Sequence, residues 1–385
     1  MPAATATRLP ALPRRARQVL GSPLLASLTA PHGVSRYLEM VSPLWSLDTE
    51  RAVVTAVRRE AGGAATLTLR PASPLPFLAG QHVRIAVEID GARRGRTYSV
   101  SSSQHRAGTF DLTVKAHPQG LVSGHVVANA APGLVVDVQP AAGAFTLPAD
   151  RPAQLLLVSG GSGITPTLSH LATLADEGHT GRIAVLHYAR SAAGVIGGDR
   201  LGALAARLPR LEVTIVPTRS PVLKQRSGRT HDPVAAGARR GHLVAQHLDG
   251  LGVDRREARA YVCGPLDLVE AVTAIWTVEG LRDLLLAEWF APRVRALPDP
   301  GATGTLTFAG SGRTVRSDGR SLLDQAESAG LAPASGCRMG ICRTCVRPKS
   351  CGTVRDLVTG ATSGDGEEEV ALCTSVALGD VTIDL

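Results

Sequence analysis

The chain has 385 residues, more than one ordinary domain contains, which predicts two or three compact units. Hydrophobic residues make up 44% and charged residues 19%, a balance that excludes a disordered chain. The net charge is +8, but Lys and Arg are scattered without interleaved aromatic residues, so we expect anionic partners and no nucleic acid.

Residues 1–46 read as a leader arm, in which Pro, Arg and short apolar stretches alternate without a sustained period. Arg14, Arg15 and Arg17 precede an apolar stretch, but Pro23 interrupts it and disfavours an export signal. No run of about 18 apolar residues occurs, so we expect no transmembrane segment. The clustered cysteines described below favour a cytoplasmic protein. The arm is either packed on the next domain or used for peripheral docking to a membrane-bound partner.

Residues 47–150 predict an antiparallel β-barrel, because short β-branched runs recur there between Gly and Pro turns. The runs are Arg51–Val57, Ala65–Leu69, Gln81–Val87, Arg96–Ser101, Phe110–Val114 and Val135–Gln139. Two tetrapeptides stand out in this unit, Arg96-Thr97-Tyr98-Ser99 and Gly120-Leu121-Val122-Ser123. Each alone is typical of an ordinary strand or turn.

Residues 151–291 predict an α/β domain with a parallel sheet, because buried-strand runs alternate with helical segments. The strand runs are Leu155–Val158, Ile183–His187, Leu211–Val216 and Ala260–Cys263, and the helical segments are Pro166–Glu177, Leu201–Arg207 and Leu266–Glu279. The segment Lys224–Gly241 is rich in Arg, Gly and Ser and predicts a long exposed loop.

Three features of this domain carry candidate chemistry. Gly160, Gly161 and Gly163 form a strand-to-helix turn that continues into Thr165 and Pro166, and such a turn allows close backbone approach of a ligand. The last strand ends in Cys263-Gly264-Pro265, although a lone Cys is usually a small buried residue. Arg190 and Ser191 follow the second strand, with Arg200 nearby; a guanidinium and a hydroxyl suit a ribose 2′-phosphate.

The last part of the chain is a linker, residues 292–303, followed by a third unit, residues 304–385. We expect a hairpin from Gly304–Phe308 and Arg313–Arg316, a helix over Ser321–Ala329 and a closing strand over Val381–Leu385.

Five of the six cysteines lie between Cys337 and Cys373. The ligand set is Cys337, Cys342, Cys345 and Cys373, with four, two and 27 intervening residues, which is the plant-type 2Fe-2S spacing. Structural zinc is the alternative, but it usually uses paired two-cysteine knuckles, so we favour the cluster. Cys351 is expected to be a non-ligand. Clustered thiols also indicate a reducing compartment.

The segment from Ser335 to Cys345 resembles the plant-type 2Fe-2S ferredoxins over about 80 residues, which implies a β-grasp fold of α+β class. The two tetrapeptides, the glycine turn and the Cys263 turn together resemble the ferredoxin-NADP reductase superfamily. That resemblance implies that Arg96 pairs with the flavin pyrophosphate. It further implies that Gly120 to Ser123 place backbone amides at a helix start against the same group, where the helix dipole favours an anion. It also implies that Tyr98 packs on the flavin ring and that Ser99 bonds the hydride-accepting nitrogen.

By the same resemblance, Thr165 holds the nicotinamide end of the dinucleotide and Cys263 lies near its transferring carbon. The stretch Glu288-Trp289-Phe290 is similar to the terminal strand of related reductases, and Phe290 is the candidate aromatic that covers the flavin. Catalytic positions are therefore assigned to Tyr98, Ser99 and Cys263.

The domain order over residues 48–385 is similar to that of reductases that feed fatty-acid desaturases, cytochromes P450 or ring-hydroxylating oxygenases. This implies an NADPH-dependent oxidoreductase that passes electrons through FAD and a 2Fe-2S cluster to such a partner. FMN is the alternative flavin, because phthalate-dioxygenase-like reductases share this order, and NADH is the alternative donor. A non-catalytic redox-sensing flavin and iron-sulfur protein is an alternative of another class, and a nucleic-acid-binding protein with structural zinc is a third. The terminal acceptor and the oligomeric state stay open.

Overall fold

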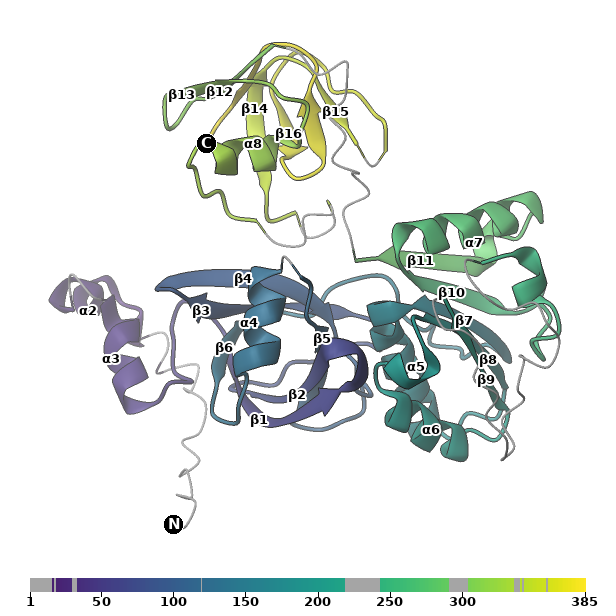
Figure 1. The fold of residues 1–385 in the computed structure, drawn as a ribbon. Coiled ribbons are helices and arrows are strands. Elements are labelled where there is room, and N and C mark those ends of the chain that lie inside the picture. The colour runs from purple at the N-terminus through teal and green to yellow at the C-terminus, as the bar shows by residue number, and fades with distance from the viewer. Residues whose placement is uncertain are drawn as a thin grey trace. The chain divides into compact units, whose positions relative to one another are not determined.

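The computed structural model describes residues 16, 19–29, 33–118, 120–218, 243–290, 304–335, 340, 343–357 and 359–385. The chain divides into two compact units, Met1–Glu288 and Trp289–Leu385, whose elements are labelled in Figure 1. The predicted loop Lys224–Gly241 and the predicted linker, residues 292–303, lie outside the described residues. In the described part, no helix is long and apolar enough to span a membrane.

The described part of the leader includes the short helices α2 (Pro23–Leu28) and α3 (Gly33–Val41). Contacts to the following segment hold α3 in place: the Ser35 hydroxyl donates to the Asp48 carboxylate over 2.6 Å. Arg51, at the start of the first barrel strand, donates to the Glu39 carboxylate over 2.6 Å and to the Pro43 carbonyl over 2.8 Å. The predicted alternative in which the arm packs on the next domain therefore holds for α3.

The barrel is a six-stranded sheet in the order β4-β3-β6-β1-β2-β5, and each neighbouring pair is antiparallel. Its elements are β1 (Arg51–Glu60), β2 (Ala64–Pro71), β3 (His82–Ile89), β4 (Ala92–Ser99), β5 (Phe110–Lys115), α4 (Leu121–Asn129) and β6 (Val135–Val138). A bridge between Val100 and Leu112 joins the end of β4 to β5 and closes the sheet. Alternate strand residues form its apolar core, which Val122 and Val126 of α4 complete. The predicted barrel is confirmed.

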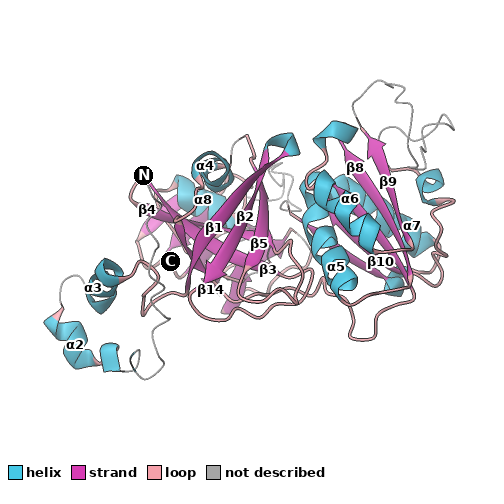
Figure 2. Ribbon diagram, turned by 90° about the horizontal axis from the view of Figure 1, so that it is seen from below, coloured by secondary structure: helices cyan, strands magenta, loops and turns pink. Residues whose placement is uncertain are grey.

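The second domain of this unit is a five-stranded sheet in the order β11-β10-β7-β8-β9. Its elements are β7 (Gln154–Gly160), α5 (Ile164–Asp176), β8 (Arg182–Ala189), α6 (Gly198–Arg207), β9 (Leu211–Pro217), β10 (Arg259–Gly264), α7 (Leu266–Val278) and β11 (Leu285–Trp289). The pairs β10–β7, β7–β8 and β8–β9 are parallel, as predicted. Helices α5 and α6 cover one face, which Figure 2 shows from below, and α7 lies on the other face in Figure 1. Right-handed crossovers require this arrangement, because the chain runs outward from β7 in opposite directions.

The second unit has a mixed sheet in the order β13-β12-β18-β14-β16, with a second small pair, β15 and β17. Its elements are β12 (Thr305–Phe308), β13 (Arg313–Arg316), α8 (Leu322–Ser328), β14 (Val346–Cys351), β15 (Val354–Asp356), β16 (Glu368–Ala371), β17 (Ser375–Ala377) and β18 (Val381–Ile383). The central pair β12–β18 is parallel. Ser321 caps α8 by accepting from the Asp324 amide over 3.2 Å, and Leu322 and Leu323 pack into the core. This is the expected α+β unit.

Candidate functional site

The end of β4 carries three buried hydroxyls, those of Thr97, Tyr98 and Ser99, that have no hydrogen-bond partner among the described residues. Burial raises the pKa of Tyr98 to about 12, and the nearby Arg96 guanidinium partly opposes that rise. Unpaired buried polar groups cost free energy unless a ligand satisfies them. The strand end therefore fits a ligand that presents both apolar ring surface and hydrogen-bonding atoms, as a flavin does.

The segment Gly120 to Ser123 begins α4, as predicted, with Gly120 at its N-cap. The Ser123 hydroxyl accepts from the His117 amide over 3.2 Å and lies 3.3 Å from the Gly120 carbonyl, so this turn is closed by its own contacts. Val122 is buried in the barrel core, whereas Leu121 is exposed. The first amides of α4 are the groups left to bind a phosphate.

The glycine turn and the Cys263 turn, far apart in sequence, lie against each other. In the register of β10 and β7, Cys263 is opposite Ser159, so both strands end at the same edge. A Cβ built on Gly163 would lie 2.1 Å from the Cys263 carbonyl oxygen, and one built on Gly160 would lie 2.8 Å from Cδ of Pro265. Glycine is therefore required by close backbone packing. Gly264 lies in the same contact, and a Cβ there would lie 3.0 Å from the Gly160 nitrogen.

The residues after this turn are part of α5. Thr165 and Pro166 are buried in its first turn, and the Thr165 hydroxyl donates to the Ser162 carbonyl over 3.0 Å. The Thr165 hydrogen bond stabilises the turn at the N-terminus of a 13-residue helix, where the helix dipole favours an anionic ligand.

Cys263 is fully buried beside a carboxylate that the sequence analysis did not assign to the site. Burial raises the pKa of the Cys263 thiol well above its ordinary value, and the Glu288 carboxylate raises it further. The Oε1 atom of Glu288 lies 3.6 Å from Nδ1 of His82, while its Oε2 has no partner among the described residues. His82 is in turn paired directly with Ser99 in the register of β3 and β4.

These contacts join Ser99, His82, Glu288 and Cys263 into one cluster where the barrel meets the α/β domain. The sequence carried a signal for Glu288, which stands in the quoted Glu288-Trp289-Phe290 stretch, but none for His82. Phe290 is half-buried and follows β11 directly. Its role as a flavin cover stays a prediction.

A second group of basic side chains lies at the end of β8. Arg190 is exposed directly after that strand, with Ser191 next to it. Lys115, the last residue of β5, has its pKa lowered by burial and by the nearby Arg190. A Cβ on Gly161 would lie 4.0 Å from Nζ of Lys115. The barrel thus adds a cation to the glycine turn, which sequence reasoning missed because Lys115 has no local motif.

Arg200 is engaged elsewhere. Its guanidinium donates to the Ser101 carbonyl over 2.6 Å and lies 4.0 Å from the Asp111 carboxylate. With only 17% of its side chain exposed, it fastens α6 to the barrel. We therefore leave Arg200 out of the phosphate site that the sequence proposed for it.

Two of the four predicted cluster ligands can be placed in the second unit. Cys345 and Cys373 are both buried in one apolar core, at the same end of the β14–β16 pair, in which Val346 is opposite Ala371. The Gly340 amide donates to Sγ of Cys373 over 3.3 Å, a contact that stabilises a metal-bound thiolate. Cys337 and Cys342 lie outside the described residues. Two buried soft ligands from separate loops fit an iron-sulfur cluster. Cys351 is exposed at the end of β14.

Comparison with known proteins agrees with this layout. Three domain families match in order: the oxidoreductase FAD-binding domain over residues 61–147, the oxidoreductase NAD-binding domain over 157–274, and the 2Fe-2S iron-sulfur cluster binding domain over 306–378. An NADPH oxidoreductase of Mycobacterium tuberculosis is 36% identical over 368 residues, covering 94% of this chain and 91% of that protein. A glycine betaine monooxygenase reductase subunit of Pseudomonas aeruginosa is 29% identical over 331 residues, covering 80% and 87%. The structure of phthalate dioxygenase reductase matches with a TM-score of 0.58 and 21% identity, covering 88% of this chain and 98% of that one.

Proposed function

The chain belongs to the ferredoxin-NADP reductase superfamily of FAD- and NAD-binding oxidoreductases with a C-terminal 2Fe-2S domain, and we propose that it is the NADPH-dependent reductase of an oxygenase system. When bound, FAD accepts a hydride from the nicotinamide and the cluster carries single electrons to the acceptor. The observation that carries the proposal is the cluster of Ser99, His82, Glu288 and Cys263, where the unpartnered hydroxyls of β4 meet the nucleotide domain.

The proposed roles of the protein groups follow from their surroundings. The unpartnered Ser99 hydroxyl would donate a hydrogen bond to a nitrogen of the flavin ring, and Tyr98 would pack its ring against the flavin. Cys263 stays a neutral thiol at neutral pH, because its pKa is raised, and so brings no charge next to the nicotinamide. Glu288 is held by His82, which fixes its carboxylate beside that thiol. These groups position the reactants and exclude water.

The choice of cofactors is part of the proposal. FAD is favoured over FMN because the N-terminus of α4 offers a second place for a pyrophosphate, next to the strand that carries Arg96. NADPH is favoured over NADH because Arg190, Ser191 and Lys115 gather positive charge and a hydroxyl at the carboxyl edge of the sheet. None of these three residues is an acid, the residue type that would suit the bare ribose hydroxyl of NADH.

The acceptor is proposed to be an oxygenase or a cytochrome P450, with a fatty-acid desaturase as a further candidate. In the sequence, Arg338 and Arg343 lie between Cys337 and Cys345 and Arg347 follows soon after, and the overall charge of +8 favours an acidic partner surface. Arg343 is exposed, whereas Arg347 donates to the Val346 carbonyl over 2.7 Å. We also propose a cytoplasmic location, since clustered reactive thiols suit a reducing compartment.

One preparation tests the assignment. Anaerobically purified protein is expected to contain FAD, iron and acid-labile sulfide, and to reduce cytochrome c with NADPH. Cys345→Ser should lose the cluster and cytochrome c reduction but keep NADPH-dependent bleaching of the flavin. A protein that binds flavin and cluster but reduces no acceptor would instead be a redox sensor, and a colourless protein containing zinc would refute the family assignment for this chain.

A further inference from the structure

Exposed apolar side chains gather on the leader. In the described part of the chain, nine large apolar side chains are exposed, and five of them belong to residues 19–41. These five are Val19, Leu28, Tyr37, Met40 and Val41. Met40 is 79% exposed and Leu28 is 78% exposed. Single exposed apolar residues are ordinary, but a group of them in one short segment indicates an interaction surface.

The geometry of α3 separates this surface from the barrel. Tyr37, Met40 and Val41 are spaced i, i+3 and i+4, so they share one helix face. The residues that hold α3 in place, Ser35 and Glu39, contact Asp48 and Arg51 instead. The barrel contact therefore leaves the apolar face of α3 open to solvent.

The leader also carries a net positive charge. Residues 1–46 contain five arginines and a single acidic residue, so their net charge is +4, half of the total of +8. The arginines are Arg8, Arg14, Arg15, Arg17 and Arg36. The one acid, Glu39, is neutralised by its 2.6 Å ion pair with Arg51. Positive charge beside an apolar face is the pattern of helices that lie at an anionic membrane surface.

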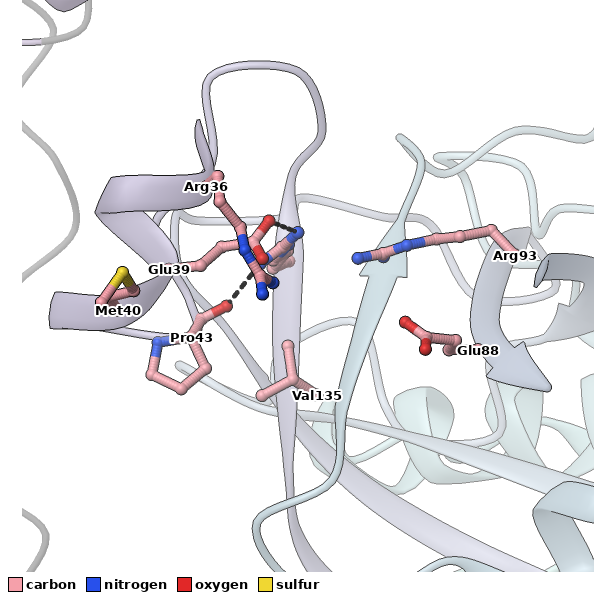
Figure 3. Close-up of a pocket in the computed structure, with 8 residues that line it drawn as sticks. Arg36, Glu39, Met40, Pro43, Glu88, Arg93 and Val135 are labelled. Carbon is pink, nitrogen blue, oxygen red and sulfur yellow. Dashed lines mark hydrogen bonds and ion pairs between the residues drawn. The ribbon is translucent and has the colours of Figure 1, made fainter. Parts of the chain in front are cut away.

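A polar pocket of about 310 Å³ lies between α3 and the barrel, and Met40 of the apolar face is one of the residues that line it. Figure 3 shows Arg36 of α3 and Arg93 of β4 pointing toward each other across it. Glu39 and Glu88 also line the pocket, and Arg93 is ion-paired with Asp137. Arg36 is thus placed to meet an anionic headgroup at the edge of the apolar face.

We propose that the leader helices α2 and α3 bind an anionic lipid bilayer surface, with Leu28, Tyr37, Met40 and Val41 inserted between headgroups and acyl chains and Arg36 against the lipid phosphates. A second copy of this chain is a poorer occupant, because a symmetric contact would bring two leaders of charge +4 together. The proposal goes beyond the reductase function and does not depend on the acceptor. It would concentrate the reductase where a membrane-bound acceptor lies.

The test is co-sedimentation of the full-length holoprotein with vesicles of phosphatidylglycerol and phosphatidylcholine, compared with vesicles of phosphatidylcholine alone. The wild-type protein should bind the anionic vesicles and lose binding at high salt. Met40→Ser with Val41→Ser should lower the partition coefficient at least about tenfold, because two exposed apolar side chains no longer enter the bilayer. Arg36→Glu should also weaken binding.

Val278→Ser is the matched control, since Val278 is 88% exposed on α7 and should bind like the wild type. Cytochrome c reduction with NADPH should be equal in all variants, which separates a folding defect or a failed reductase assignment from failed lipid binding. Equal binding by the wild type and the double variant, or no preference for anionic vesicles, would overturn the proposal. So would a dimer in sedimentation velocity that the double variant abolishes, because a second copy would then cover this face.

Discussion

Replacing Gly163 by alanine tests whether the close contact between the glycine turn and the Cys263 turn sets the geometry of hydride transfer. The new Cβ would lie 2.1 Å from the Cys263 carbonyl oxygen and 2.8 Å from Cα of Gly264, and both are backbone atoms that cannot rotate away. Ordinary van der Waals contact begins near 3.4 Å, so the two turns must separate.

The size of the effect follows from that separation. The turns would move apart by about 1.3 Å, and a displacement of about 1 Å at a reacting centre costs roughly a hundredfold in rate. Overpacking should also lower the free energy of unfolding by about 1–3 kcal/mol. Flavin content should not change, because the hydroxyls of β4 and the start of α4 belong to the barrel.

The measurement is anaerobic stopped-flow bleaching of the flavin by NADPH. Gly202→Ala is the control: Gly202 is exposed inside α6 with nothing within 4 Å of a built Cβ. This control should keep the wild-type rate and gain roughly 0.5–1 kcal/mol in stability. Bleaching of Gly163→Ala at the wild-type rate would show that the contact between the turns does not position the reactants.

Three further outcomes are expected. Ser99→Ala should slow flavin bleaching by about a hundredfold while the flavin stays bound, because one preorganised hydroxyl is lost. An unchanged bleaching rate would show that Ser99 takes no part in hydride transfer. Arg190→Ala should raise KM for NADPH at least about tenfold in steady-state assays and leave KM for NADH nearly unchanged, because only NADPH carries the 2′-phosphate. An equal rise of both KM values would contradict this role of Arg190. Burial lowers the pKa of His170 and of His187 to about 4, so below pH 6.5 the unfolded chain takes up protons that the folded chain does not. Stability should fall as pH drops from about 6.5 to about 4 and then level off. His170→Gln should reduce the pH dependence of the urea midpoint over that range, with His187 still contributing.

Much of the fold was predictable because it depends on patterns of apolar, Gly and Pro residues that are close together in the sequence. Apolar runs separated by Gly and Pro mark the barrel strands, and the alternation of strands with helices implies a parallel sheet. The barrel, the α/β domain and the last unit are confirmed in that order, and so is the family. The strand bounds shifted slightly: β4 begins at Ala92, whereas the sequence predicted a start at Arg96.

The candidate site was predictable only where its residues are adjacent in sequence. Arg96 to Ser99, the glycine turn and the cysteine spacing are short motifs whose chemistry can be inferred without coordinates. His82 and Lys115 have no such motif, and Arg200 was assigned to a phosphate site on sequence proximity alone. The structure engages Arg200 with Ser101 of the barrel instead.

The sequence by itself therefore determined the order of the domains, since it depends on neighbours along the chain. The hydroxyls at the end of β4 and the ligand set of the cluster are likewise read from neighbouring residues, and the ligand set stays a prediction. The tertiary structure decided which of these groups meet. Because β10 is inserted beside β7, Cys263 reaches the turn at Gly163, and because β11 ends next to the barrel, Glu288 reaches His82. Strand order and register are properties of the whole sheet, and no local pattern in the chain encodes them.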